Sequence, residues 1–201
     1  MGSLGEDWVW KQLAGLDADS VMRTTGAGYE SQSSSFMLAC FGQPICISVG
    51  ERRVYARSER GEALLATLGP GFSALALGYL AYARGVPPAG RLINPAQLPG
   101  GEIFVRGAHV LPMDRVAQRY GDRPDEFRRM GRELDGAELE YKDMSVALWP
   151  FPRLPITLIV WSGDDEFPPR ASLLLDANCS NLLPTDIIWS AASLTVNLML
   201  S

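Results

Sequence analysis

The chain has 201 residues, of which 47% are hydrophobic and 20% are charged, a composition that excludes a disordered or disulfide-dense protein. Its formal net charge of -5 argues against a surface built to neutralise phosphates, so we expect no nucleic-acid partner. The length predicts a single domain over residues 1–201. The three cysteines and the lack of a basic-then-apolar leader predict a cytoplasmic protein.

The first quarter of the chain predicts two short helical segments followed by an antiparallel meander. An amphipathic helix is expected over residues 6–16, and a helical turn ended by glycines over residues 17–28. Turns that contain glycine then separate three short strands, which are predicted at Phe36–Phe41, Ile45–Val49 and Arg53–Ala56.

Two cysteines lie on either side of the first turn of this meander. If Gly42–Pro44 form a three-residue turn, Cys40 lies opposite Cys46 across the ladder. Directly opposed positions can approach disulfide distance, although the bridge is strained there and a reducing cytosol opposes it. Two packed thiols and a redox pair therefore remain as alternative interpretations.

An uncharged stretch, residues 63–83, has about the length of a membrane span. A Gly-Pro-Gly break follows Leu68, and such breakers end one helix and begin another. We therefore predict two core helices and no membrane contact. The first helix is capped by Ser58 and ends near Leu68, and the second covers Gly71–Arg84.

The middle of the chain contains a long loop rich in proline and glycine, residues 85–101, in which Asn94 can cap a turn. A loop of this length usually has a function, so Pro99, Gly100 and Gly101 are candidate site residues.

After this loop the pattern predicts one short strand and two helices. The strand is expected at Ile103–Val105, and the helices at Pro112–Tyr120 and Pro124–Leu134.

The last third of the chain predicts three strands and a closing helix. The strands are expected at Ser145–Trp149, Ile156–Trp161 and Ala171–Asp176, and the helix is expected to be capped by Thr185. The elements are thus clustered as strand-rich, helical and again strand-rich. This order favours the α+β class, with an antiparallel sheet of the N-terminal three-stranded meander plus the C-terminal strands packed against a helical layer.

Three consecutive carboxylates, Asp164, Asp165 and Glu166, lie in the connection between the last two predicted strands. Carboxylates could bind a hard cation such as Mg²⁺, but consecutive side chains diverge and the spacing of a calcium loop is absent. Asp176 cannot join them, because a regular hairpin places it beside Ile156 at the other end of the ladder. We predict no metal site, and either a solvated turn or a partner-binding or catalytic loop.

His109 is the only histidine, so any mechanism that needs an imidazole has to use it. Its predicted position between a strand and a helix suits a site, although a loop histidine is commonly polar surface. The sequence contains no serine-hydrolase elbow, no dinucleotide fingerprint, no phosphate loop and no zinc-ligand spacing. The cofactor is therefore unknown.

Three stretches of the chain carry a resemblance to a known family. They are LDADSVMRTTGAGYE, GVPPAGRLINPAQLPGGEIF and LIVWSGDDEFPPRASLLLDANCSNLLPTDI. Together they resemble the bacterial and archaeal domain-of-unknown-function family DUF3786 over essentially the whole chain. The resemblance implies a domain that stands alone, or is joined to a cysteine-rich iron–sulfur segment in anaerobes with corrinoid and one-carbon metabolism. This chain lacks that segment, so the resemblance implies an accessory or ligand-binding role and supplies no catalytic residue.

The leading hypothesis is a non-catalytic ligand-binding or accessory protein whose two unusual loops form one surface. The expected members of that surface are Asp164, Asp165, Glu166, Phe167, Pro99, Gly100, Gly101 and His109. One alternative is a metal-assisted hydrolase or transferase that uses the three carboxylates, with His109 as acid or base. Another is a homo-oligomer subunit that buries exposed aromatic residues against a copy. The partner, a small molecule or a protein, is not identified by the sequence.

Overall fold

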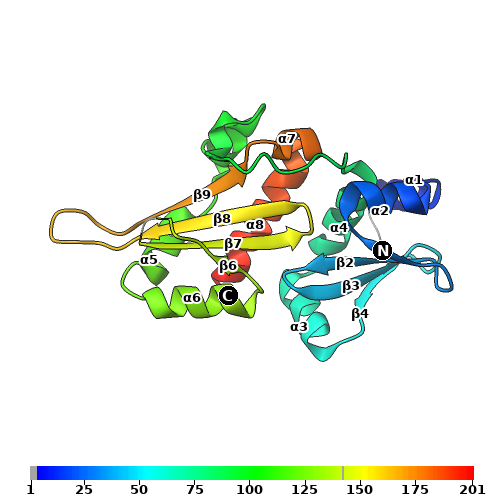
Figure 1. Cartoon of the computed structure of the whole chain (residues 1–201), viewed down its shortest axis with the longest axis horizontal. Helices are drawn as coiled ribbons and strands as arrows, with labels where there is room; N and C mark the ends of the chain where they lie inside the picture. The colour runs from blue at the N-terminus through cyan, green and yellow to red at the C-terminus, as the bar shows by residue number, and fades with distance from the viewer. Residues whose placement is uncertain (1–3, 142) are drawn as a thin grey trace.

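The computed structural model describes residues 4–141 and 143–201 and confirms the α+β class (Figure 1). The helices are α1 (Leu4–Ala14), α2 (Ala18–Thr25), α3 (Glu59–Leu68), α4 (Gly71–Tyr82), α5 (Met113–Tyr120), α6 (Pro124–Glu133), α7 (Cys179–Leu182) and α8 (Thr185–Met199), with short 3-10 helices η1 (Pro95–Gln97), η2 (Gly101–Phe104) and η3 (Gly107–His109). The strands are β1 (Gly28–Glu30), β2 (Ser35–Cys40), β3 (Gln43–Ser48), β4 (Arg53–Ala56), β5 (Leu92–Ile93), β6 (Ala137–Glu138), β7 (Met144–Phe151), β8 (Leu154–Trp161) and β9 (Arg170–Asp176).

The strands form two antiparallel sheets, in the orders β1-β2-β3-β4 and β5-β9-β8-β7-β6. The expected meander and the expected C-terminal strands are thus both present, but they do not share one sheet. The ends of β2 and β7 meet where the Phe41 N–H donates to the carbonyl of Trp149 at 2.8 Å. Most of the buried apolar side chains of both sheets belong to one cluster, which also contains the buried side chains of helix α4.

The turn between β2 and β3 corrects the predicted cysteine pairing. Phe41 and Gly42 have φ angles of 46° and 72°, so the turn has two residues in the left-handed region, as hairpin turns of type I′ require. Cys40 consequently pairs with Gln43, and Cys46 pairs with Met37. The two cysteines face opposite sides of the sheet and cannot form a redox pair with each other. Burial raises the pKa of the Cys40 thiol and keeps it protonated.

The same turn gives a testable prediction at Gly42. A Cβ atom there would clash with the Cβ of Asp135, at a φ angle that side chains rarely adopt. We expect Gly42→Ala to lower the free energy of unfolding by about 2 kcal/mol or more, measured by urea denaturation. The control is Gly50→Ala in the next turn, where nothing lies within 4 Å of an added Cβ and little change is expected. Equal stability of the two variants would contradict the prediction.

Several local predictions are confirmed and two are wrong. Ser58 caps α3 by accepting from the Gly61 N–H, and Asn94 forms a capping box at η1. The segment expected as a strand at Ile103–Val105 belongs mainly to η2, because the chain is still turning after the glycine pair. Thr185 begins α8 but does not cap it, since its hydroxyl donates to the carbonyl of Pro99 at 2.8 Å.

Helices α3 and α4 meet at a bend of 101° at the Gly-Pro-Gly break. The two helices together have the length and hydropathy of a membrane span, although the bend separates them. No single helix within residues 4–141 and 143–201 is long and apolar enough to cross a membrane.

Candidate functional site

The acidic turn is the tip of the β8–β9 hairpin, and hydrogen bonds to its first carboxylate, Asp164, stabilise its conformation. The Asp164 Oδ1 atom accepts from the N–H groups of Glu166 at 2.9 Å and Phe167 at 2.7 Å. The Asp164 N–H in turn donates to the carbonyl of Phe167 at 2.9 Å. These N–H groups lower the pKa of Asp164, because they stabilise the ionised carboxylate. Asp164 is therefore committed to the turn.

The three carboxylates do not converge on a common centre. Asp165 and Glu166 are exposed, and within the described parts of the chain neither forms an ion pair. Across those parts, no group of three or more His, Cys, Asp or Glu side chains is placed to hold a metal ion. Phe167 is 60% exposed beside them. The metal-assisted alternative stays a prediction that no contact here supports.

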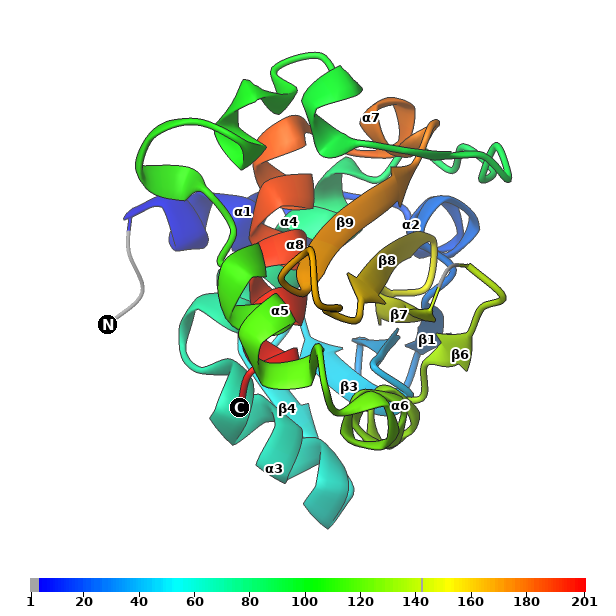
Figure 2. The ribbon, with the colours of Figure 1, turned by 90° about the vertical axis from the view of Figure 1, so that its left-hand side faces the viewer.

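The proline-glycine loop is held at the opposite end of β9 from the acidic tip. Strand β5, which lies within this loop, pairs through Leu92 with Asp176, whereas the tip ends before Arg170. The hairpin neck packs elsewhere, with Pro169 against Gly121 at the end of α5. Figures 1 and 2 show the tip projecting away from the segment that contains η1 and η2.

The structure therefore does not bring the two predicted loops into one surface. Pro99 is attached to the start of α8 through Thr185, Gly100 lies beside the same threonine, and Gly101 is buried against the carbonyl of Pro95. Whether either loop binds a partner stays a prediction.

His109 lies beside α8 and makes its contacts there. Its ring meets the ring of Trp189 edge-on, with 5.0 Å between the centroids. Its backbone carbonyl accepts from the Trp189 Nε1–H at 2.7 Å. No hydrogen bond or ion pair within the described segments links His109 to the three carboxylates of the tip, so their expected cooperation has no support in these contacts.

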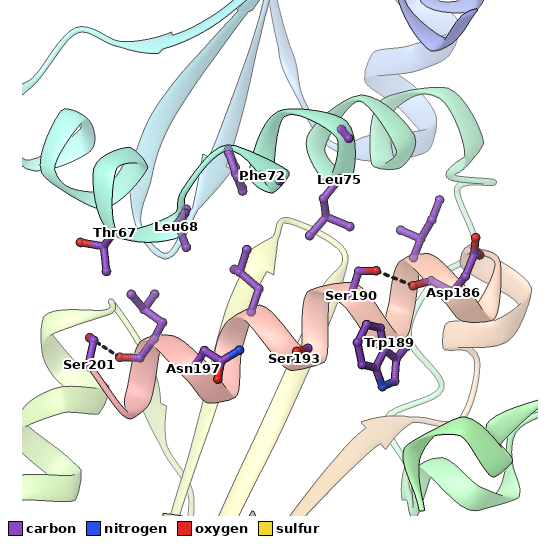
Figure 3. A pocket seen from close by; sticks show the side chains of 15 residues that line it. Thr67, Leu68, Phe72, Leu75, Asp186, Trp189, Ser190, Ser193, Asn197 and Ser201 are labelled. Carbon is purple, nitrogen blue, oxygen red and sulfur yellow. Dashed lines mark hydrogen bonds between the residues drawn. The ribbon is translucent and has the colours of Figure 1, made fainter. Parts of the chain in front are cut away.

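A groove that the sequence analysis missed runs between α8 and the bent pair α3–α4 (Figure 3). Its volume is about 530 Å³. It is lined by Thr67, Leu68, Gly71, Phe72, Ala74, Leu75, Asp186, Ile187, Trp189, Ser190, Ser193, Leu194, Asn197, Leu198 and Ser201. We call this space the α4–α8 groove.

One wall of the α4–α8 groove is apolar and the other carries a polar stripe. Figure 3 shows Leu75 on α4 pointing toward α8, and Leu68 and Phe72 on the same side. The polar residues on the other wall are Asp186, Ser190, Ser193 and Asn197 of α8, together with Ser201 two residues beyond its end. Steps of three or four residues place them along one side of the helix. That spacing is the sequence signal that could have indicated this wall.

Comparison with known proteins gives a family and no function. A family model described as a domain of unknown function, DUF3786, matches residues 17–198 of the 201-residue chain. No curated protein matches the chain, and no solved structure does.

Proposed function

Because the chain belongs to the DUF3786 family, which is described as a domain of unknown function, we propose a role for it from its own geometry. We propose that it is a binding protein whose small-molecule ligand occupies the α4–α8 groove. The observation that carries this proposal is the groove itself. Its volume of about 530 Å³ lies within the range of about 300–1,000 Å³ that is usual for ligand sites.

The lining of the groove also supports the proposal. Ligand sites are mainly apolar with a few placed polar groups, and this groove joins the apolar wall of α4 to the hydroxyl, amide and carboxylate groups of α8. Its floor and walls are regular helices, which hold side chains more precisely than loops do. The ligand we propose is therefore amphipathic.

The accessory role and the link to corrinoid and one-carbon metabolism come from the family resemblance alone. We propose them on that ground only, whereas the groove bears on the size and polarity of the ligand. We also propose that the protein is cytoplasmic, as its sequence predicts. Asp164, Asp165 and Glu166 do not line the α4–α8 groove, so we do not place the ligand at the acidic tip.

The experiment uses the uncharged fluorophore Nile red and a variant that fills the groove. Ala74 lines the groove from an exposed position on α4, and Ala74→Trp places an indole in the space. We expect Nile red fluorescence to rise with the native protein and Ala74→Trp to weaken binding about tenfold or more, which corresponds to about 1.4 kcal/mol.

The matched control is Ala66→Trp, at an exposed alanine of α3 that does not line the groove. It is expected to bind Nile red as the native chain does. The proposal is overturned if Ala74→Trp and Ala66→Trp, both folded by circular dichroism, bind the dye equally well.

A further inference from the structure

Three of the four hydroxyl groups that line the α4–α8 groove donate their protons within the protein. Each donates to a backbone carbonyl three or four positions earlier in the chain. The pairs are Thr67 with Ala63 at 3.0 Å, Ser190 with Asp186 at 2.8 Å, and Ser201 with Leu198 at 2.7 Å. A hydroxyl has one proton and two lone pairs, so these side chains offer a ligand hydrogen-bond acceptors and no donor.

The indole of Trp189 likewise has no free hydrogen-bond donor. Its only donor, Nε1–H, is taken by the carbonyl of His109 at 2.7 Å. Figure 3 shows the ring on the side of α8 away from Leu75, so the indole N–H offers the groove no donor. The hydrogen bond to His109 also fixes the orientation of the ring.

The charge of the groove, like its hydrogen-bond acceptors, favours a cationic ligand. Asp186 is the only acidic side chain in the lining, and no lysine, arginine or histidine lines the groove. Asp186 is exposed, and no ion pair to it is found among the residues that the structure describes. An anionic ligand would meet a carboxylate and no cationic side chain.

Some donors do remain on the groove, and all of them are neutral. They are the amide of Asn197, the hydroxyl of Ser193, and the N–H groups in the first turn of α4 near Gly71. Such groups suit a carbonyl or hydroxyl oxygen of the ligand. The partial positive charges at the starts of α4 and α8 favour an anion, and they oppose the full negative charge of Asp186.

We infer that the ligand of the α4–α8 groove is an amphipathic organic cation. Its ammonium group donates hydrogen bonds to the Asp186 carboxylate and to the free lone pairs of the neighbouring Ser190 hydroxyl. Its apolar body lies along the wall formed by Leu68, Phe72 and Leu75. This inference rests on the proposed function, since it names the ligand class of the same site.

The test compares three probes that share one apolar body and differ in charge: phenylbutylamine, phenylbutanol and phenylbutyrate. Binding is followed by NMR titration of the full chain, with the Trp189 indole N–H signal as the reporter. That signal is assigned by its loss in Trp189→Phe. We expect the amine to bind more tightly than the carboxylate by about fivefold or more, with the alcohol between them.

The charge of Asp186 is then removed while its shape is kept. We expect Asp186→Asn to weaken the amine about two- to fivefold and to leave the alcohol unchanged, which also reports that the groove is still folded. The control is Asp165→Asn, which makes the same change of charge on the hairpin tip and is expected to alter none of the three affinities.

The outcomes separate this inference from the proposed function. If phenylbutyrate binds as tightly as phenylbutylamine, or if Asp186→Asn leaves the amine unaffected, the inference is overturned although the groove still binds ligands. A titration in which the amine shifts no groove signal overturns it as well. The proposed function fails separately, when the Nile red signal is indifferent to Ala74→Trp.

Discussion

Replacing Asp176 with alanine is expected to lower the free energy of unfolding by about 3–4 kcal/mol. Its side chain is 5% exposed and accepts from three backbone N–H groups. Oδ1 accepts from Ala89 at 2.9 Å and Asn178 at 2.8 Å, and Oδ2 accepts from Gly90 at 2.9 Å. The carboxylate thus ties the start of the long proline-glycine loop to the end of β9, and its loss leaves three donors without an acceptor.

Asparagine at the same position separates charge from shape. The amide oxygen in Asp176→Asn can keep two of the three hydrogen bonds, while its NH₂ group faces the donor of Gly90. We expect a loss of about half the alanine value, measured by urea denaturation with an unchanged m-value.

The control for Asp176 is Asp165→Ala on the exposed hairpin tip, which is expected to be nearly neutral. If Asp176→Ala were as stable as that control, the carboxylate would not anchor the loop.

The elements that the sequence predicted well are those with a local physical signal. The cap at Ser58, the capping box at Asn94 and the break after Leu68 all act within a few residues, so they can be read without knowing the fold. Asp176 was likewise expected at the far end of the hairpin ladder. The structure pairs its neighbour Leu175 with Ile156, so it lies within one residue of the expected place.

The predictions that were wrong depend on contacts between distant segments. A left-handed phenylalanine is uncommon, so the sequence predicts Phe41 as a strand residue, and the predicted hairpin register is shifted as a result. Thr185 is a good capping residue by type, yet its hydroxyl is used by Pro99, which lies 86 positions earlier. Propensity does not report such a competing partner.

The candidate site illustrates the same limit. The polar spacing of α8 is visible in the sequence, but a polar stripe is typical of any exposed helix face. It becomes one wall of a groove only because the 101° bend at the α3–α4 junction carries Thr67, Leu68 and Phe72 over α8. In the conspicuous acidic turn, in contrast, the first carboxylate accepts hydrogen bonds from the backbone of the turn itself. Unusual composition was therefore a weaker guide to the candidate site than helix geometry.

Replacing Tyr79 with phenylalanine is expected to lower the free energy of unfolding by about 2–3 kcal/mol. Tyr79 is fully buried on α4, and burial raises the pKa of its phenol, which therefore stays protonated as a donor. The hydroxyl donates to the carbonyl of Thr25 at 2.7 Å and accepts from the Arg153 N–H at 3.2 Å. One oxygen thus joins α4 to the end of α2 and to the turn between β7 and β8.

Phenylalanine keeps the ring stack on Phe151, whose centroid lies 4.4 Å away, and removes only these two hydrogen bonds. Tyr79→Ala is expected to cost more, about 3–5 kcal/mol, because it also leaves a cavity. The control is Tyr141→Phe, at a tyrosine that is 49% exposed, where little change is expected. Urea denaturation in which Tyr79→Phe matches Tyr141→Phe would show that the buried hydroxyl does not hold these three segments together.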